Sequence, residues 1–175
     1  MLEVGGFAWR FATSDDAGVL DRLAAEGANR VLFSLPATEQ EFAARLRGQG
    51  YRLAMLCTSG ARLFGAAAIT ARSNRDLNAM IACFFVDPSD ATLSLALYVR
   101  HVFWAQPVHR LYTQLPLVQA VDEYRSLLAS VGFQEEGVVA RHAIIAGESR
   151  DVAVFGLLRP EFEAWCQDKD ARLLL

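Results

Sequence analysis

Alternating and helical patterns of apolar residues divide the first part of the chain into a strand and two helices. Residues 7–13 alternate apolar and polar positions, which is typical of a strand. Thr13 or Ser14 can then cap a helix with two aspartates in its first turn, where the helix dipole stabilises acidic side chains. A second helix is expected to begin at Thr38, because Glu41 has the spacing of a capping box.

Three strands and a long helix are expected next. Segments 51–59 and 62–73 are joined by a short Ser-Gly turn, which predicts an antiparallel hairpin. Residues 78–86 are apolar almost throughout, as in a strand covered on both faces, so we expect this strand at the centre of the sheet. The helix predicted over 92–106 is ended by Pro107.

The last third of the chain predicts a strand, a helix and a final hairpin. The strand covers 109–117, and the helix covers 121–131 with one apolar face. Gly132 follows where a left-handed residue can end that helix. Two strands with a period of two and a short helix complete the pattern: 136–145, 150–158 and the segment from Pro160.

Composition narrows the class of protein. A chain of 175 residues matches one domain, 1–175, and no stretch reaches the roughly eighteen apolar residues that a membrane span needs. Three cysteines without CxxC spacing predict neither a disulfide framework nor a zinc site, which fits a cytoplasmic protein. The net charge is −3 and the basic residues are scattered, so nucleic acid is not an expected partner.

The order of elements and the segment "SLLASVGFQEEGVVARHAIIAGESRDVAVFGLL" resemble the GNAT superfamily of N-acyltransferases, and most of all its ribosomal-protein N-terminal acetyltransferase-like branch. The resemblance covers nearly the whole chain. It implies a single α/β domain whose central sheet is mixed, mostly antiparallel, has about seven strands and is flanked by helices.

The resemblance also implies a site for an acyl-CoA co-substrate, either acetyl-CoA or another acyl-CoA. Backbone groups of the strand ending at Phe85 and Val86 would hold the pantetheine arm, and the start of the next helix would hold the phosphates. The residues implied are Phe85, Val86, Ser89, Asp90, Ala91, Thr92, Leu93 and Ser94.

That phosphate loop is degenerate. The family's glycines are replaced by Thr92 and Ser94, its leading cation is replaced by Ala91, and Asp90 would repel phosphate unless it is turned away to cap the helix. An ordinary turn and helix cap explain the same residues.

Candidate catalytic residues lie in the late helix. The family's Tyr, which is followed by three residues and then Gly-Phe, corresponds to Leu128, so the resemblance leaves Tyr124 as the nearest hydroxyl for a general acid, with Ser126 beside it. Tyr124 equally suits the apolar face of the helix. The three histidines, including His142, are interpreted as packing or surface residues.

The resemblance places the acceptor pocket between the first two helices and the last hairpin. The residues implied there are Val31, Leu32, Phe33 and Leu35. They would favour an apolar or bulky acceptor, or they pack on the sheet.

The first functional hypothesis is transfer of an acyl group, most simply acetyl, from acyl-CoA to the primary amine of a small molecule or peptide, without metal. One alternative is a non-catalytic GNAT-like binding or scaffold protein, for which a homodimer is one expected form. Another is an acyltransferase that uses an acyl-carrier protein as donor. A basic patch at the mouth of the cleft would favour this alternative, because carrier proteins are acidic.

Overall fold

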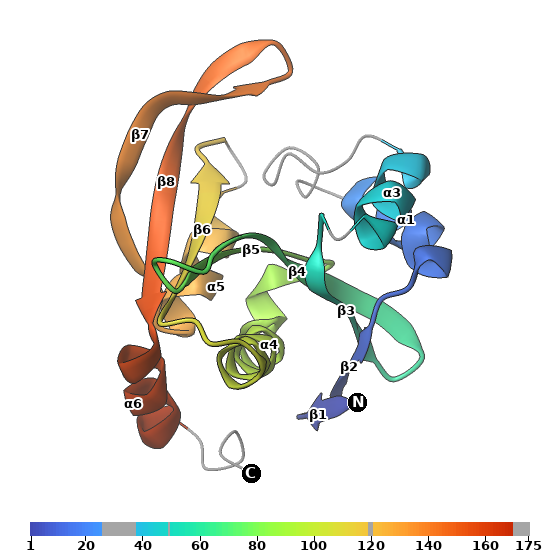
Figure 1. The fold of residues 1–175 in the computed structure, drawn as a ribbon, viewed down its shortest axis with the longest axis horizontal. Coiled ribbons are helices and arrows are strands. Elements are labelled where there is room, and N and C mark those ends of the chain that lie inside the picture. Colours follow the sequence, from blue (N-terminus) through green and yellow to red (C-terminus); the bar gives the residue numbers. More distant parts are fainter. Residues whose placement is uncertain (26–37, 49, 119–120, 170–175) are drawn as a thin grey trace.

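The computed structural model describes residues 1–25, 38–48, 50–118 and 121–169. Figure 1 shows the elements in this part of the chain. In chain order they are β1 (Leu2–Val4), β2 (Phe7–Phe11), the 3-10 turn η1 (Ser14–Asp16), α1 (Ala17–Ala25), α3 (Glu39–Arg47), β3 (Arg52–Ser59), β4 (Arg62–Ser73), β5 (Asn78–Phe85), the 3-10 turn η2 (Pro88–Asp90), α4 (Thr92–Ala105), β6 (Arg110–Pro116), α5 (Asp122–Ser130), β7 (Gln134–Ile145), β8 (Glu148–Leu158) and α6 (Arg159–Lys169).

The strands form one mixed sheet in the order β1-β2-β3-β4-β5-β6-β8-β7. Neighbouring strands are antiparallel except β5 and β6, which are parallel. The α/β class and the mostly antiparallel sheet are therefore confirmed, and β5 is central as expected. The described residues form eight strands where about seven were expected. The added strand is β1, whose three residues are too few to show a period and which is recognised only by its pairing with β2.

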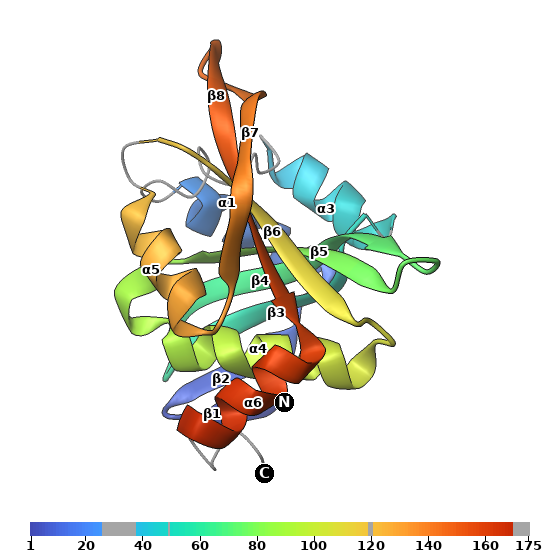
Figure 2. The same cartoon turned by 90° about the vertical axis from the view of Figure 1, so that its left-hand side faces the viewer.

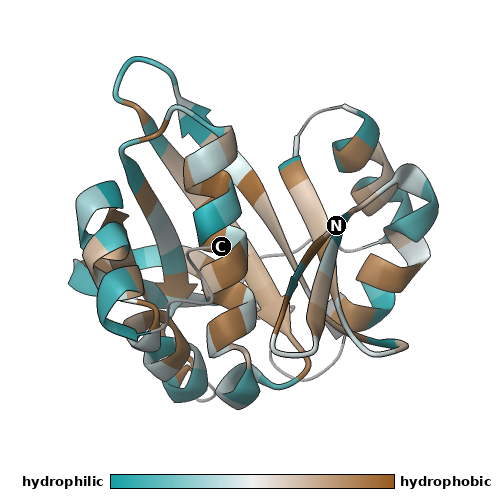
Figure 3. Ribbon diagram, turned by 90° about the horizontal axis from the view of Figure 1, so that it is seen from below, coloured by the Kyte–Doolittle hydropathy of each residue, from teal (hydrophilic) through white to brown (hydrophobic). Residues whose placement is uncertain are grey.

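Helices cover both faces of this sheet. The buried face of α4 packs on a cluster that includes Cys83 and Phe85 of β5. The alternate residue Phe84 packs in a second cluster with α1 and α3. Figures 1 and 2 show α4 on the opposite side of the sheet from α1 and α3, and Figure 3 shows apolar residues along α4 and the strands it covers. None of the helices in the described ranges is long and apolar enough to cross a membrane.

The two parallel strands pair over only part of their length. Their backbones are in register from Asn78 to Met80 of β5, opposite Arg110 to Tyr112 of β6. Beyond this point β5 stays paired with β4, and β6 stays paired with β8 up to Pro116. Since each strand keeps its outer partner, the two separate into a wedge whose free edges are the second halves of β5 and β6.

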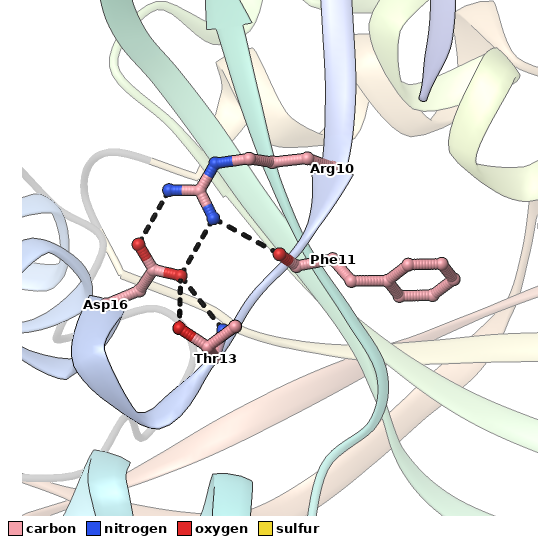
Figure 4. Close-up of polar contacts among 4 residues, drawn as sticks. All are labelled: Arg10, Phe11, Thr13 and Asp16. Carbon is pink, nitrogen blue, oxygen red and sulfur yellow. Dashed lines mark hydrogen bonds and ion pairs between the residues drawn. The ribbon is translucent and has the colours of Figure 1, made fainter.

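An ion pair fixes the turn from β2 into α1 (Figure 4). Arg10 donates to both oxygens of the Asp16 carboxylate, at 2.8 and 2.6 Å. The same carboxylate accepts the Thr13 N–H at 2.9 Å. Mainly because of the hydrogen bonds from Arg10, the pKa of Asp16 falls from 3.8 to about 2. The ionised form of Asp16 therefore stabilises this turn and the start of α1.

The end of β5 is held by a close approach between Phe85 and Gly65 of β4. A Cβ at position 65 would lie 2.3 Å from the Phe85 Cδ1 atom and 2.9 Å from the Phe84 carbonyl oxygen. Trp9 lies edge-on to the Phe85 ring, with centroids 6.3 Å apart. Only glycine leaves room for this ring position, so Gly65 helps to fix the backbone of Phe85 at the wedge.

We expect Gly65→Ala to destabilise the fold by about 1–3 kcal/mol, because the methyl group would overpack against the Phe85 ring. Chemical unfolding measures the loss. Phe85→Leu removes the ring atoms involved, so the double variant should be more stable than the two separate losses predict. Strictly additive losses would show that the ring does not fill the space at Gly65.

We expect Asp16→Asn to lower the free energy of unfolding by about 1–2 kcal/mol at neutral pH, because the paired carboxylate is lost. The folded-state pKa is depressed, so the contribution of Asp16 is fully present above 3.8 and disappears as the pH falls through about 2. Unfolding at pH 7, 5 and 3 should show the gap between wild type and variant narrowing at the lowest pH. Asp15→Asn, at the exposed neighbouring position, is the control and should cost little at any of these pH values.

Candidate functional site

The wedge between β5 and β6 ends at the backbone of Phe85. The Phe85 N–H donates to the Tyr124 hydroxyl at 2.9 Å, and the Tyr124 hydroxyl donates to the Phe85 carbonyl oxygen at 3.4 Å. Both backbone groups therefore point to the edge that β6 has left, and α5 reaches across with Tyr124 to pair them. Of the two hydroxyls predicted to be catalytic, those of Tyr124 and Ser126, the described structure brings only that of Tyr124 to the wedge.

Tyr124 is only 2% exposed. Burial is the main reason why its pKa is raised well above the usual value, and this effect exceeds the opposing hydrogen bond from Phe85. The phenol is therefore protonated at neutral pH. Ser126 is exposed, and two positions along a helix place it about 200° around the axis from Tyr124. The two predicted catalytic residues do not share a face.

The loop before α4 already binds a carboxylate of its own chain. The Asp87 carboxylate accepts the Ser89 N–H at 3.0 Å and the Ser89 hydroxyl at 2.6 Å. These hydrogen bonds lower the pKa of the exposed Asp87, so the group is anionic at neutral pH. Asp90, three residues after Asp87, is also exposed. The loop thus presents two acidic side chains where the family resemblance implied phosphate.

The first turn of α4 is largely committed to packing. Ala91 and Ser94 are fully buried. The Ser94 hydroxyl is hydrogen-bonded to the Cys57 thiol at 3.0 Å, and its carbonyl accepts the Trp9 indole N–H at 3.0 Å. The Thr92 hydroxyl is bonded to that of Ser130 at the end of α5, at 2.8 Å.

Leu93 is partly buried beside the main core cluster, and the Val86 N–H donates to the Phe64 carbonyl at 2.8 Å. Among the described residues that were predicted to hold the cofactor, Phe85 is the one whose backbone groups face the open edge of β5. The side chains of the others face the core, α5 or solvent. What remains for an anion is the set of first-turn N–H groups that every helix start leaves without an intrahelical acceptor.

These residues fit the two ends of coenzyme A differently. The Phe85 N–H and carbonyl match the hydrogen-bonding needs of an amide-containing pantetheine arm, provided that Tyr124 releases them. The nucleotide phosphates do not fit the start of α4, because residues 87–94 contain no lysine or arginine and the carboxylates of Asp87 and Asp90 stand there.

A cavity of about 340 Å³ opens on the face of the sheet that α3 covers. Its floor is formed by the diverging strands, with Ala82 on β5 and Gln114 on β6. The tip of the β7–β8 hairpin and the end of α3 stand on either side of it (Figure 1). The lining residues are Arg45, Tyr51, Thr70, Met80, Ile81, Ala82, Thr113, Gln114, Pro116, His142, Ala143, Ile144 and Val152.

Sequence reasoning missed most of this cavity. It expected the last hairpin to contribute, and His142, Ala143 and Ile144 do line it. The predicted acceptor residues Val31, Leu32, Phe33 and Leu35 lie outside the described residues. Arg45, Tyr51 and Gln114 come from three separate segments and show no shared motif, so no pattern in the sequence could have grouped them.

Other reactive chemistry is absent from this part of the chain. Within the ranges that the structure describes, no three His, Cys, Asp or Glu residues are placed to hold a metal ion. The cysteines at 57, 83 and 166 are buried and unpaired with one another. Burial raises the pKa of Cys57 to about 11 and that of Cys83 to about 12, so neither is a ready nucleophile.

No protein-family model matches the sequence, and no curated protein matches it. Solved structures do match. RimL, a ribosomal L7/L12 alpha-N-protein acetyltransferase solved with coenzyme A, is 13% identical, with a TM-score of 0.72 over 89% of this chain and 95% of that chain. Mycobacterium smegmatis RimJ, solved with a coenzyme A disulfide, is 20% identical, with a TM-score of 0.72 over 89% and 83%.

The ribosomal-protein-S5-alanine acetyltransferase of Vibrio fischeri is 13% identical, with a TM-score of 0.70 over 91% of this chain and 97% of that chain. At these identities the likeness concerns the fold. The matches cover 89–91% of this chain and 83–97% of the partner chains. This chain therefore has the fold of the GNAT-type acetyltransferases.

Proposed function

We propose that this protein transfers an acyl group, most simply acetyl, from a coenzyme A thioester to a primary amine. The observation that carries the proposal is the wedge between β5 and β6. The Phe85 backbone N–H lies at its β5 edge, and the cavity of about 340 Å³ lies between the same two strands on the face that α3 covers. A thioester on the edge of β5 would meet an amine in the cavity across the gap between the strands. The shared fold, in which RimL and RimJ were solved with coenzyme A, supports this choice of donor.

Direct attack of the amine on the thioester asks three things of the protein. It must align the two reactants, donate a hydrogen bond to the carbonyl oxygen as negative charge develops, and supply a proton to the departing sulfur. The Phe85 N–H is the proposed hydrogen-bond donor. The Tyr124 phenol, kept protonated by burial, is the proposed proton donor. The amine attacks as the neutral form, the C–S bond breaks as the C–N bond forms, and the proton that the nitrogen then loses balances the one that Tyr124 gives to the sulfur.

Tyr124 must move before a donor can bind in this way. Its hydroxyl now holds both backbone groups of Phe85, so a donor has to replace those two hydrogen bonds with its own. Rotation of the phenol away from the β5 edge would leave it beside the thioester that displaced it. In this proposal Tyr124 pairs the strand edge in the absence of donor and serves as acid in its presence.

The acyl-pantetheine arm is proposed to supply most of the affinity for the donor. Asp87 and Asp90 oppose phosphates at the start of α4, and Asp87 already takes up the Ser89 N–H. We do not propose an acyl-carrier protein as donor, because Asp122 and Glu123 beside Tyr124 are also exposed and acidic. Carrier proteins are acidic, and like charges disfavour such a contact.

A second candidate is a non-catalytic GNAT-like binding protein. The pairing of the Phe85 backbone with Tyr124 favours it. If Tyr124 never leaves these groups, no acyl donor can bind at the β5 edge, while the cavity on the other face stays open to a ligand. The two candidates differ in one measurable property, which is whether any thioester or thiol of the pantetheine series binds.

We expect acetyl-pantetheine and acetyl-CoA to bind with affinities within about threefold of each other, because the nucleotide end gains little from this chain. Isothermal calorimetry or thermal shift tests this. A ligand at about one hundred times its dissociation constant should stabilise the fold by roughly 2.7 kcal/mol. If acetyl-CoA bound tenfold more tightly than acetyl-pantetheine, the phosphates would contact the protein. If neither of them nor free coenzyme A bound, the non-catalytic candidate would be favoured.

We expect Tyr124→Phe to lower the turnover of acyl transfer by roughly 100-fold without weakening the affinity for acetyl-pantetheine. The proton donor is lost, whereas the Phe85 N–H is freed for the donor. Steady-state kinetics and calorimetry separate the two effects. Tyr112→Phe, on β6 and outside the cavity lining, is the control and should change neither. Turnover that survives Tyr124→Phe would remove this phenol from the mechanism.

A further inference from the structure

The charges of the cavity on the α3 face are one-sided. Among its described lining residues, Arg45 is the only one that carries a permanent charge, and no aspartate or glutamate is present. A ligand with only a positive charge would meet a guanidinium and no counter-charge. A ligand with an anionic group would gain a charge-assisted, two-point hydrogen bond from arginine.

The exposed Arg45 side chain packs against Tyr51. It lies over the ring of Tyr51, with Cζ 5.6 Å from the ring centroid, and it forms no ion pair with another described residue. Burial raises the pKa of Tyr51 and outweighs the opposing charge and hydrogen bond of Arg45, so the Tyr51 phenol stays neutral and can donate a hydrogen bond. Glu41, one turn earlier on α3, has a smaller raising effect on this pKa and does not line the cavity.

The remaining lining divides into an apolar part and a neutral polar part. Met80, Pro116, Ile144 and Val152 offer apolar contacts. The polar part consists of Thr70, Gln114 and His142, whose oxygen and imidazole acceptors suit the N–H groups of an amine. Gln114 belongs to β6, at the wedge, while Arg45 belongs to α3.

We infer that this cavity binds a small primary amine that also carries a carboxylate, with the carboxylate on Arg45 and the amine toward the wedge at Gln114. The volume, about 340 Å³, lies at the lower end of the range for small-molecule sites, which fits an amino-acid-sized ligand. A single arginine matches a singly charged carboxylate better than a phosphate dianion. That this ligand is the acyl acceptor rests on the proposed function, but its binding does not.

The first experiment measures binding by calorimetry without any acyl donor. The probes are L-leucine, L-leucinamide and phosphoethanolamine, which compare a carboxylate with a neutral amide and with a phosphate. We expect L-leucine to bind at least tenfold more tightly than L-leucinamide, because the amide cannot pair with the guanidinium. Equal affinities, tighter binding of phosphoethanolamine, or no binding of L-leucine would each overturn the inference.

The second experiment uses a matched pair of arginines in the last turn of α3. Arg45→Gln should weaken L-leucine binding about tenfold or more and leave L-leucinamide binding unchanged. Arg47→Gln removes the same charge from the same turn, so it has a similar effect on the helix, but Arg47 does not line the cavity and L-leucine binding should persist. Equal losses in both variants would show that the effect comes from helix stability or overall charge. Unchanged binding in Arg45→Gln would remove Arg45 from the site.

Failure of this inference and failure of the proposed function are distinguishable. If L-leucine binds through Arg45 but no acyl transfer occurs with any donor, the cavity is a site for carboxylated amines in a non-catalytic protein. If acyl transfer occurs but prefers amines without a carboxylate, and Arg45→Gln leaves its KM unchanged, the function stands and the assigned ligand class is wrong.

Discussion

The incomplete pairing of β5 with β6 is the constraint on which both candidate sites depend. Each strand is held along its full length by an outer neighbour, β4 or β8, and the two share only three register positions. The sheet twists and the outer neighbours retain their partners, so the two central strands separate. Separation leaves backbone hydrogen-bonding groups at Phe85 that a buried strand cannot leave unpaired, and it leaves space on the α3 face that becomes the cavity.

The Phe85 edge is paired by a side chain in place of a strand. An unpaired backbone group in a dry environment costs free energy comparable to a lost hydrogen bond, and Tyr124 removes this cost with one hydroxyl that both accepts and donates. The same physics explains how the edge can serve a ligand. A molecule with a secondary amide can compete for these groups, because an amide, like the phenol, can both accept from the Phe85 N–H and donate to the Phe85 carbonyl.

Electrostatics separates the two sides of the wedge. On the proposed donor side Asp87, Asp90, Asp122 and Glu123 are exposed, and Asp87 accepts the Ser89 N–H. On the proposed acceptor side Arg45 is the only permanent charge among the described lining residues. In the proposed function, the backbone of the donor site is thus combined with poor complementarity to a nucleotide, and the positive charge lies where the acceptor would bind.

The sequence by itself determined the class and order of the elements, because alternation, helical period, capping residues and turn signals are local. It also marked Leu128 and the acidic, glycine-free loop at 87–94 as departures from the family pattern, and Tyr124 as the nearest hydroxyl. It could not show that Asp87 binds the loop's own N–H groups, that Ser94 faces Cys57, or that β1 pairs at the edge. The cavity, with Arg45 in its wall, was decided by tertiary structure alone, since α3, β5, β6 and the β7–β8 hairpin are distant in sequence and meet only when the central strands part.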